Sequence, residues 1–223
     1  MQVNTGARIG EIAAFAREAA RLFDTLGIDY VSHGNLSLTD ACSDLHLDPG
    51  DVERALLRLQ PEVSAGHQPG TTLADIVRDL TTGGFPAIYY RLGRVSADVA
   101  EVAAGLPANT RSGDSLRRAC DELVLRINGH LQREERDLLP RLANFTTADR
   151  TSIAHQLAAC IAEHFAITAG IAELRAAIAE VETLRPACAR LRAAVRDLEN
   201  EMRQHMHLEN NVLFPRVLPL AEA

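Results

Sequence analysis

The sequence predicts an all-α protein, with an antiparallel four-helix bundle preceded by a small N-terminal helical module. Three observations support this prediction. The 223 residues are rich in Ala, Leu, Glu and Arg, which favour helices, and include only three Tyr, six Phe and no Trp. Four long segments in the second part of the chain place apolar residues at helical spacing, with short joints between them. The first part is divided by Gly and Pro into shorter segments.

Residues 1–64 form the predicted N-terminal module. Its first helix is indicated by apolar residues at helical spacing, and Gly27 ends it as a left-handed terminator. Ser37 is the predicted N-cap of a second helix, and the segment 48–51, with its Pro and Gly between two Asp residues, caps a third. We therefore expect three short helices here.

Residues 65–223 form the predicted bundle, which begins with a linker containing Gly and Pro at 65–70. Turn and capping residues separate its long amphipathic segments. The expected helices cover 72–80, 86–104, 114–142, 147–180 and 184–214. Short joints between long helices make neighbouring helices antiparallel.

Charge and hydropathy argue against two classes of partner. The net charge is −7 and basic residues are interspersed with acidic ones, so we expect no nucleic-acid partner. The most apolar stretch, Ile153–Ala179, contains two His and two Glu, so we expect no membrane span. The chain does not open with a basic and then apolar leader, so we expect a cytoplasmic protein.

The cysteines do not suggest a dithiol site. They are far apart in sequence, and no C-x-x-C pair occurs among Cys42, Cys120, Cys160 and Cys188. We favour reduced, mostly structural thiols over a disulfide framework.

Two H-x-x-x-E motifs on different predicted helices carry the main chemical signal: His130 with Glu134, and His205 with Glu209. Four residues advance a helix by about 400°, so the two side chains of each motif share one face. A single motif of this kind usually marks a surface pair. Two such pairs, each followed by Leu-Leu-Pro or Leu-Phe-Pro, favour a dinuclear iron or manganese site.

His164 is a third candidate ligand. Ile161, Ile167, Thr168 and Ile171 are expected on its helical face, which turns the imidazole into the bundle. Alone it would be a core histidine, but together with the two motifs it is predicted to bind metal. His207 is rotated about 200° from His205 and should face away from the site. His155 is also out of phase with His164 and is expected to take no part.

Several stretches together resemble the iron–sulfur cluster repair proteins, a di-iron, hemerythrin-like family of "repair of iron centres" proteins. The stretches are Arg8–Ile12, Arg21–Tyr30, Gly34–Cys42 and His205–Arg216, with His130, Glu134 and His164 between them. The resemblance implies a hemerythrin-like bundle behind an ScdA-type module. It further implies a cytoplasmic protein of nitrosative and oxidative stress, which repairs iron–sulfur clusters or reacts with nitric oxide or oxygen.

The resemblance also implies a cofactor, partners and a ligand set. The cofactor would be two non-haem iron ions, with manganese as the alternative. The partners would be a diatomic gas and damaged iron–sulfur proteins, and we favour a homodimer. Glu134 and Glu209 would bridge the metals, with His130 on one ion and His164 and His205 on the other.

Two departures from the family pattern add candidates. The family carries adjacent cysteines after Ile-Asp-Tyr, where this chain has Val31 and Ser32 followed by His33. His33 is then either a cap or gate for the metal site or a solvated loop residue. The family also has bundle histidines that this chain lacks. Tyr89 stands near one of these positions and could supply a phenolate, with Tyr90 as the alternative, or both could simply pack in the helix.

Three functions remain open at this stage. The first is a di-iron protein of the cluster-repair type, and the second is a reversible sensor or carrier of oxygen or nitric oxide. The third is a divergent relative without metal that acts through protein contacts. Whether the protein is an enzyme is left open, and metal analysis of the purified protein would test the third possibility first.

Overall fold

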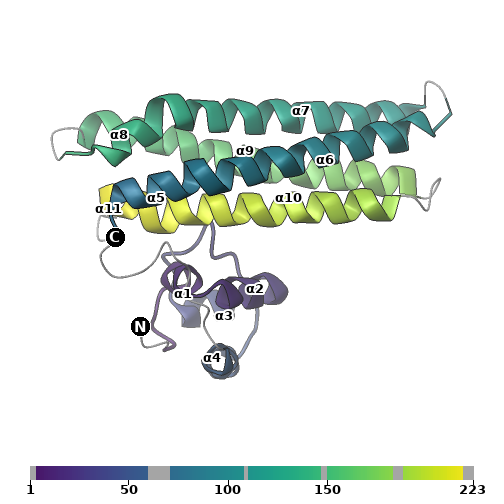
Figure 1. Ribbon diagram of the computed structural model, residues 1–223. Coiled ribbons are helices and arrows are strands. Elements are labelled where there is room, and N and C mark those ends of the chain that lie inside the picture. Colours follow the sequence, from purple (N-terminus) through teal and green to yellow (C-terminus); the bar gives the residue numbers. More distant parts are fainter. Residues whose placement is uncertain (1–3, 60–70, 108–109, 147–149, 183–187, 218–223) are drawn as a thin grey trace. The chain divides into compact units, whose positions relative to one another are not determined.

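The computed structural model describes residues 4–59, 71–107, 110–146, 150–182 and 188–217 (Figure 1). They form two compact units. Val77–Arg203 is one, and the described residues up to Ile76 together with those from Gln204 onward are the other. The described residues are mainly helical and contain no strand, although Arg8 and Ser37 form an isolated bridge and Ala16 also takes part in one. The predicted all-α fold class is confirmed.

The N-terminal module contains more helices than predicted. Its described helices are α1 (Ile9–Phe15), α2 (Arg17–Leu26), α3 (Leu38–Asp44) and α4 (Pro49–Arg58). The single first helix was a wrong prediction, because the chain breaks at Ala16, which has extended backbone angles (φ −142°, ψ 124°). The break lets α1 and α2 pack against each other. No Gly or Pro marks the break, and Ala16 takes part in a β-bridge there.

The predicted caps of the module are confirmed. Gly27 ends α2 with φ +75°, a conformation that glycine adopts without strain. Ser37 Oγ accepts a hydrogen bond from the backbone N–H of Asp40 at 3.1 Å. Asp48 accepts one from the backbone N–H of Asp51 at 2.8 Å, so both helices begin with a satisfied donor.

Four long helical runs make up the rest of the chain, and three of them pass through π-helical turns, labelled η. The runs are α5 (Leu73–Asp79), η2 (Leu80–Gly84) and α6 (Phe85–Ala104); α7 (Arg111–Arg133), η3 (Glu134–Leu138) and α8 (Leu139–Ala143); α9 (Arg150–Glu182); and α10 (Cys188–Leu208), η5 (Glu209–Leu213) and α11 (Phe214–Val217). The predicted break between 80 and 86 is wrong, because Gly83 and Gly84 lie inside η2 and the helix continues. The predicted helix starts at 147 and 184 lie outside the described residues.

The bundle unit packs through stripes of buried residues that recur every three or four positions. Figure 1 shows α6, α7, α9 and α10 side by side, and α7 packs against both α6 and α9. The stripes of the two best-packed helices are Leu116, Cys120, Leu123 and Ile127 on α7, and Ile153, Leu157, Cys160, Ile167, Ile171, Leu174 and Ile178 on α9. Spacing of this kind is typical of knobs-into-holes packing. The buried polar residues His130 and His164 continue these stripes, so they occupy core positions.

The apolar helix α9 bears on the prediction that the chain has no membrane span. By length and composition, its segment Ile153–Val181 is apolar enough to cross a membrane, although its charged residues were expected to exclude this. A core helix of a soluble bundle passes the same test. The buried stripe of α9 and its packing along α7 account for part of this hydrophobicity, since 39% of the apolar window is buried.

Candidate metal centre

Four buried donors of the bundle unit converge between α7 and α9. His130 lies in the last turn of α7 and Glu134 begins η3, while Cys160 and His164 are one turn apart on α9. Each offers one ligand atom, and these atoms lie within 4.8 Å of one another. None of the four residues is more than 4% exposed. Imidazole, carboxylate and thiolate groups are the ligands that transition metals take in proteins, so this donor set fits a metal ion.

One carboxylate oxygen of Glu134 lies close to side chains of both helices. The Cys160 thiol donates a hydrogen bond to Glu134 Oε1, with Sγ 3.0 Å away, and His130 Nε2 lies 3.2 Å from the same oxygen. Cys160 Sγ is also 3.5 Å from His164 Nε2. The rings of His130 and His164 meet edge to face with centroids 4.9 Å apart. The donors therefore form one contiguous polar group within the apolar core.

Glu163 orients the His130 ring. Its Oε2 lies 3.0 Å from His130 Nδ1, and its other oxygen accepts from Arg133 Nη2 at 2.7 Å. Burial raises the pKa of Glu163, but hydrogen bonds from Arg133 and His130 outweigh burial and leave the pKa below its ordinary value. A carboxylate can only accept, so Nδ1 carries the proton and Nε2 is directed at Glu134. This carboxylate–histidine arrangement is the one that fixes metal-binding imidazoles in proteins.

The second H-x-x-x-E pair lies in the other compact unit. His205 is in the last turn of α10 and Glu209 begins η5, and both are buried. His205 Nε2 is 3.4 Å from Glu209 Oε2. The pair therefore repeats the local arrangement of His130 and Glu134.

Both glutamates begin a π-helical turn, and a proline follows each turn at the same spacing. The backbone N–H of Leu139 bonds to the carbonyl of Glu134, and that of Phe214 to the carbonyl of Glu209. The next residue in each case is a proline, which lacks an N–H and would clash with the carbonyl four residues earlier in an α-helix. The wider turn accommodates the proline. Single π turns inside α-helices are frequent at functional sites.

The N-terminal module contacts the turn that begins at Glu209. Asn211 donates its side-chain amide to the carbonyl oxygens of Tyr30 at 3.0 Å and Val31 at 3.3 Å. A Cβ on Gly34 would lie 1.9 Å from Asn211 Oδ1, and one on Gly10 would lie 2.8 Å away. Both glycines are therefore required by the close approach of Asn211.

His207 was expected to face away from the site, and the structure shows that it is nevertheless not exposed to solvent. It is buried, and its ring meets Tyr30 edge-on with centroids 5.1 Å apart. Its Nδ1 lies 3.0 Å from the side-chain nitrogen of Asn211. His207 thus packs against the module, while His155 is exposed on α9.

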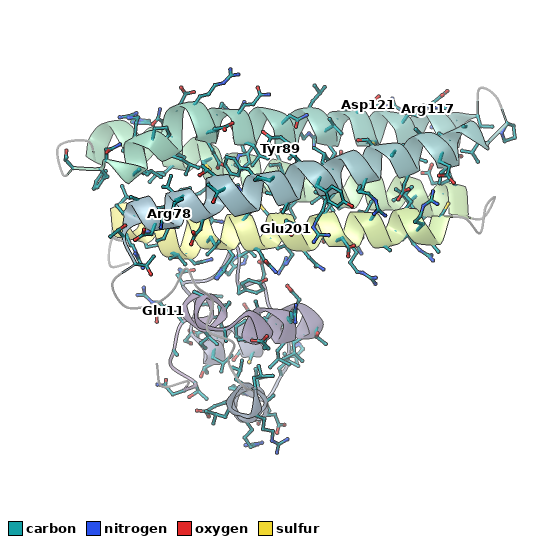
Figure 2. All side chains as sticks on the ribbon, in the orientation of Figure 1. Glu11, Arg78, Tyr89, Arg117, Asp121 and Glu201 are labelled. Carbon is teal, nitrogen blue, oxygen red and sulfur yellow. The ribbon has the colours of Figure 1, made fainter. Side chains whose placement is uncertain are left out.

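Three further candidates lie at more accessible positions. Tyr89 is 38% exposed on α6, and Tyr90 is 66% exposed. Figure 2 places Tyr89 on the side of α6 that faces α7. Burial raises the pKa of the Tyr89 phenol, and the charges of Glu135 and Glu134 add to this rise, with Arg136 opposing them. His33 is exposed and pairs with Asp29 at 3.3 Å. The roles of Tyr89 and His33 at a metal stay predictions.

The environment of His164 is only partly as predicted. Ile167 and Ile171 are buried on its face, whereas Ile161 is 37% exposed and Thr168 is also exposed. The sequence analysis placed too many residues on the buried face of α9, because the buried stripe covers less than half of the helix surface.

Sequence reasoning missed Cys160 and Glu163. Cys160 was treated as a structural thiol, although it stands four residues before His164, the spacing at which the two H-x-x-x-E motifs place their donors. That repeated spacing was the available signal. Glu163 carried no such signal, because its partner His130 is 33 residues away in sequence and on another helix.

The comparisons with known proteins identify the family of the chain. Residues 91–217, more than half of the chain, match the Hemerythrin HHE cation binding domain. The chain belongs to the hemerythrin HHE family. Residues 5–60 match ScdA_N, a domain of unknown function (DUF542). The predicted resemblance to the cluster-repair family is confirmed, and the buried donors of this HHE domain are the chemistry that a cation-binding domain requires.

Two curated relatives cover almost the whole chain. Both are called iron–sulfur cluster repair protein YtfE, one from Pectobacterium carotovorum and one from Pectobacterium atrosepticum. Each is 26% identical over 227 residues, which span 94% of this chain and 96% of the relative. The alignment with each relative therefore runs through both matched domains of this chain.

Proposed function

We propose that this hemerythrin HHE protein is a non-haem di-iron protein of nitrosative and oxidative stress that repairs damaged iron–sulfur clusters. The observation that carries the proposal is the pair of buried H-x-x-x-E motifs, each with its glutamate at the start of a π-helical turn. The names of the two relatives support cluster repair as the activity. Nitric oxide or oxygen is the proposed diatomic partner, and damaged iron–sulfur proteins are the proposed protein partners.

The proposed ligands are the five residues of the sequence prediction. Glu134 and Glu209 would be the carboxylates shared by two iron ions, His130 would bind one ion, and His164 and His205 would bind the other. Support for including the last pair comes from the register of α10, which is continuous to Leu208. Its buried residues include Leu191, Val195, Leu198 and Met202, and the same spacing continues to His205 and Glu209. One face of this helix thus carries both the apolar stripe and the donors.

The chain's own residues would prepare this site before any metal binds. Glu163 and Arg133 hold the His130 ring, and the contacts of Asn211 with the N-terminal module hold the turn that carries Glu209. When bound, iron would supply electron transfer and open coordination positions for a diatomic ligand. A fixed set of buried donors favours binding because little conformational entropy remains to be lost.

A small pocket leads to the cluster from the side of α9 and η3. It has a volume of about 110 Å³ and is lined in part by Arg133, Glu134, Asp137, Gln156, Cys160 and Glu163. A single water requires roughly 10–15 Å³, so the pocket has room for several waters. It therefore admits a diatomic gas or a metal ion to Glu134.

Metal analysis of the purified protein tests the proposal. We expect iron in the protein, and we expect Glu134→Ala and Glu209→Ala each to lose it, because each removes an anionic ligand. Glu135→Ala is the matched control, since Glu135 neighbours Glu134 but is exposed. Full iron content in both ligand variants would contradict the di-iron site.

The same pocket suits a second candidate, a reversible carrier or sensor of nitric oxide or oxygen. Incubating the iron-loaded protein with a protein whose iron–sulfur cluster has been damaged separates the two functions. Recovery of that protein's activity supports repair. Full spectral reversibility on gas removal, without recovery, supports the carrier. We also propose a homodimer in the cytoplasm, which size-exclusion chromatography and cell fractionation would test.

A further inference from the structure

We propose that Cys160 is a thiolate ligand of this metal centre, so that the site has a sulfur donor beside its nitrogen and oxygen donors. The proposal rests on the proposed function and concerns the same site. It starts from the position of Cys160 in the buried group between α7 and α9, where its Sγ lies within 4.8 Å of the donor atoms of His130, Glu134 and His164.

The contacts of Cys160 differ from those of an ordinary core cysteine. Its Sγ is 3.0 Å from a carboxylate oxygen of Glu134 and 3.5 Å from Nε2 of His164, both on residues of the proposed ligand set. Cys160 is 4% exposed, yet it lines the small pocket that reaches Glu134. A metal ion that comes to lie between Glu134 and His164 would therefore meet the sulfur as well.

The spacing of donors along the helices supports the same assignment. Cys160 and His164 are four residues apart, as are His130 and Glu134, and as are His205 and Glu209. The first bundle run breaks the pattern. Its π turn begins at Leu80, six residues before Pro86, and at the positions that correspond to the Glu and His of the other two turns it has Leu80 and Ile76. The other three helical runs thus carry two donors each, four residues apart. On α9 the pair is complete only if the thiol of Cys160 is counted beside His164.

Binding through sulfur requires the thiol to lose its proton. The S–H bond breaks, a metal–sulfur bond forms, and the proton leaves to the buffer, with no change of oxidation state. The hydrogen bond from Cys160 to Glu134 Oε1 is lost in the same step, so the sulfur no longer competes with a metal for that oxygen. The thiolate adds a negative charge that offsets part of the charge of the bound cations.

The competing explanation is that Cys160 only donates a hydrogen bond to a buried carboxylate. Serine is close to cysteine in size and also donates, so Cys160→Ser preserves that bond and removes the sulfur. Cys120→Ser is the matched control, because Cys120 is also buried in the bundle, on α7, outside the donor cluster. Cys160→Ala serves as a second variant if the serine variant does not fold.

Two measurements on metal-loaded protein decide between the explanations. The full-length chain and its variants are loaded with Co²⁺, and bound metal is quantified together with the near-ultraviolet thiolate-to-cobalt band. X-ray absorption on the unaltered protein loaded with Zn²⁺ then reports the ligand shell, where sulfur lies at about 2.3 Å and imidazole nitrogen at about 2.0–2.1 Å. The second measurement requires no variant.

We expect the unaltered protein and Cys120→Ser to bind Co²⁺ with the band, and the zinc spectrum to contain a sulfur shell. Cys160→Ser should lose the band and bind Co²⁺ at least roughly tenfold more weakly, since even residues that only orient a ligand contribute this much. Bound metal without a sulfur shell, or with a band that persists in Cys160→Ser, would overturn the sulfur ligand and leave the metal site standing. Failure of the unaltered protein to bind metal would overturn both.

Discussion

Asn211 donates a hydrogen bond from its side-chain amide to the backbone carbonyl of Tyr30, 3.0 Å away and 181 residues earlier in the chain. The same nitrogen lies 3.3 Å from the carbonyl oxygen of Val31. Asn211 belongs to η5, two residues after Glu209, so the contact attaches the N-terminal module to a turn that carries a proposed ligand. One physical role of the module is therefore to fix the backbone of that turn.

Gly34→Ala should destabilise this attachment. The new methyl group would lie 1.9 Å from Asn211 Oδ1 and 2.9 Å from the carbonyl oxygen of Tyr30, so one of these groups must move. We expect a loss of about 1–3 kcal/mol in the free energy of unfolding, measured by urea denaturation. Gly93→Ala is the control: Gly93 lies within α6 with nothing near its added methyl, so it should gain up to about 1 kcal/mol. Equal effects of the two substitutions would contradict the role of Gly34.

Glu163→Gln should weaken metal binding without unfolding the bundle. The substitution keeps the shape of the side chain but removes the charge that the Arg133 guanidinium and the His130 ring share. We expect metal affinity, measured by competition with a chelator, to fall roughly 10- to 100-fold. Glu173→Gln is the control on the same helix, since its exposed carboxylate pairs with Arg126 at 3.7 Å. A chelator titration that does not distinguish the two variants would remove Glu163 from the site.

His207→Ala should separate stability from metal binding. The substitution removes the edge-on contact of the His207 ring with Tyr30. It also removes the ring nitrogen that lies 3.0 Å from the Asn211 side chain, and it leaves a cavity at a buried position. We expect a loss of about 1–3 kcal/mol in unfolding free energy with the iron content unchanged. His205→Ala should instead lose iron, because it removes a proposed ligand. If His207→Ala loses iron as fully as His205→Ala, the assignment of faces on α10 is wrong.

The periodic parts of the molecule were predictable from the sequence. The stripe on α9 repeats every three or four residues from Ile153 to Ile178, and in an all-α chain such spacing indicates a helix with one buried face. The H-x-x-x-E pairs were predictable for the same reason, because helix geometry alone brings residues four apart together.

Features that depend on distant contacts were not predictable. The break at Ala16 has no Gly or Pro, and it coincides with a β-bridge and with the packing of α1 on α2, neither of which local sequence shows. A buried cysteine on an apolar stripe looks like a core residue until Glu134, 26 residues away, is placed beside it. The burial of His207 was not predicted, because its contact Tyr30 lies in the N-terminal module. The angular positions of residues on one helix contain no information about such a contact.

The last prediction concerns colour. A phenolate bound to ferric iron absorbs in the visible through charge transfer, which imidazole and carboxylate ligands do not provide. We expect oxidised, iron-loaded protein to have this band and Tyr89→Phe to lose it. Tyr89 is favoured over Tyr90 because it is the less exposed of the two, 38% against 66%.

A thiolate from Cys160 would also absorb in the visible when bound to ferric iron, so the band alone does not identify its source. Resonance Raman excitation within the band separates them, because a phenolate enhances aromatic ring vibrations and a thiolate enhances iron–sulfur stretching. Ring vibrations that disappear in Tyr89→Phe and persist in Cys160→Ser would assign the phenolate to Tyr89. Their disappearance in Tyr90→Phe instead would move the ligand by one position on α6. A band with iron–sulfur vibrations alone would leave both tyrosines as packing residues.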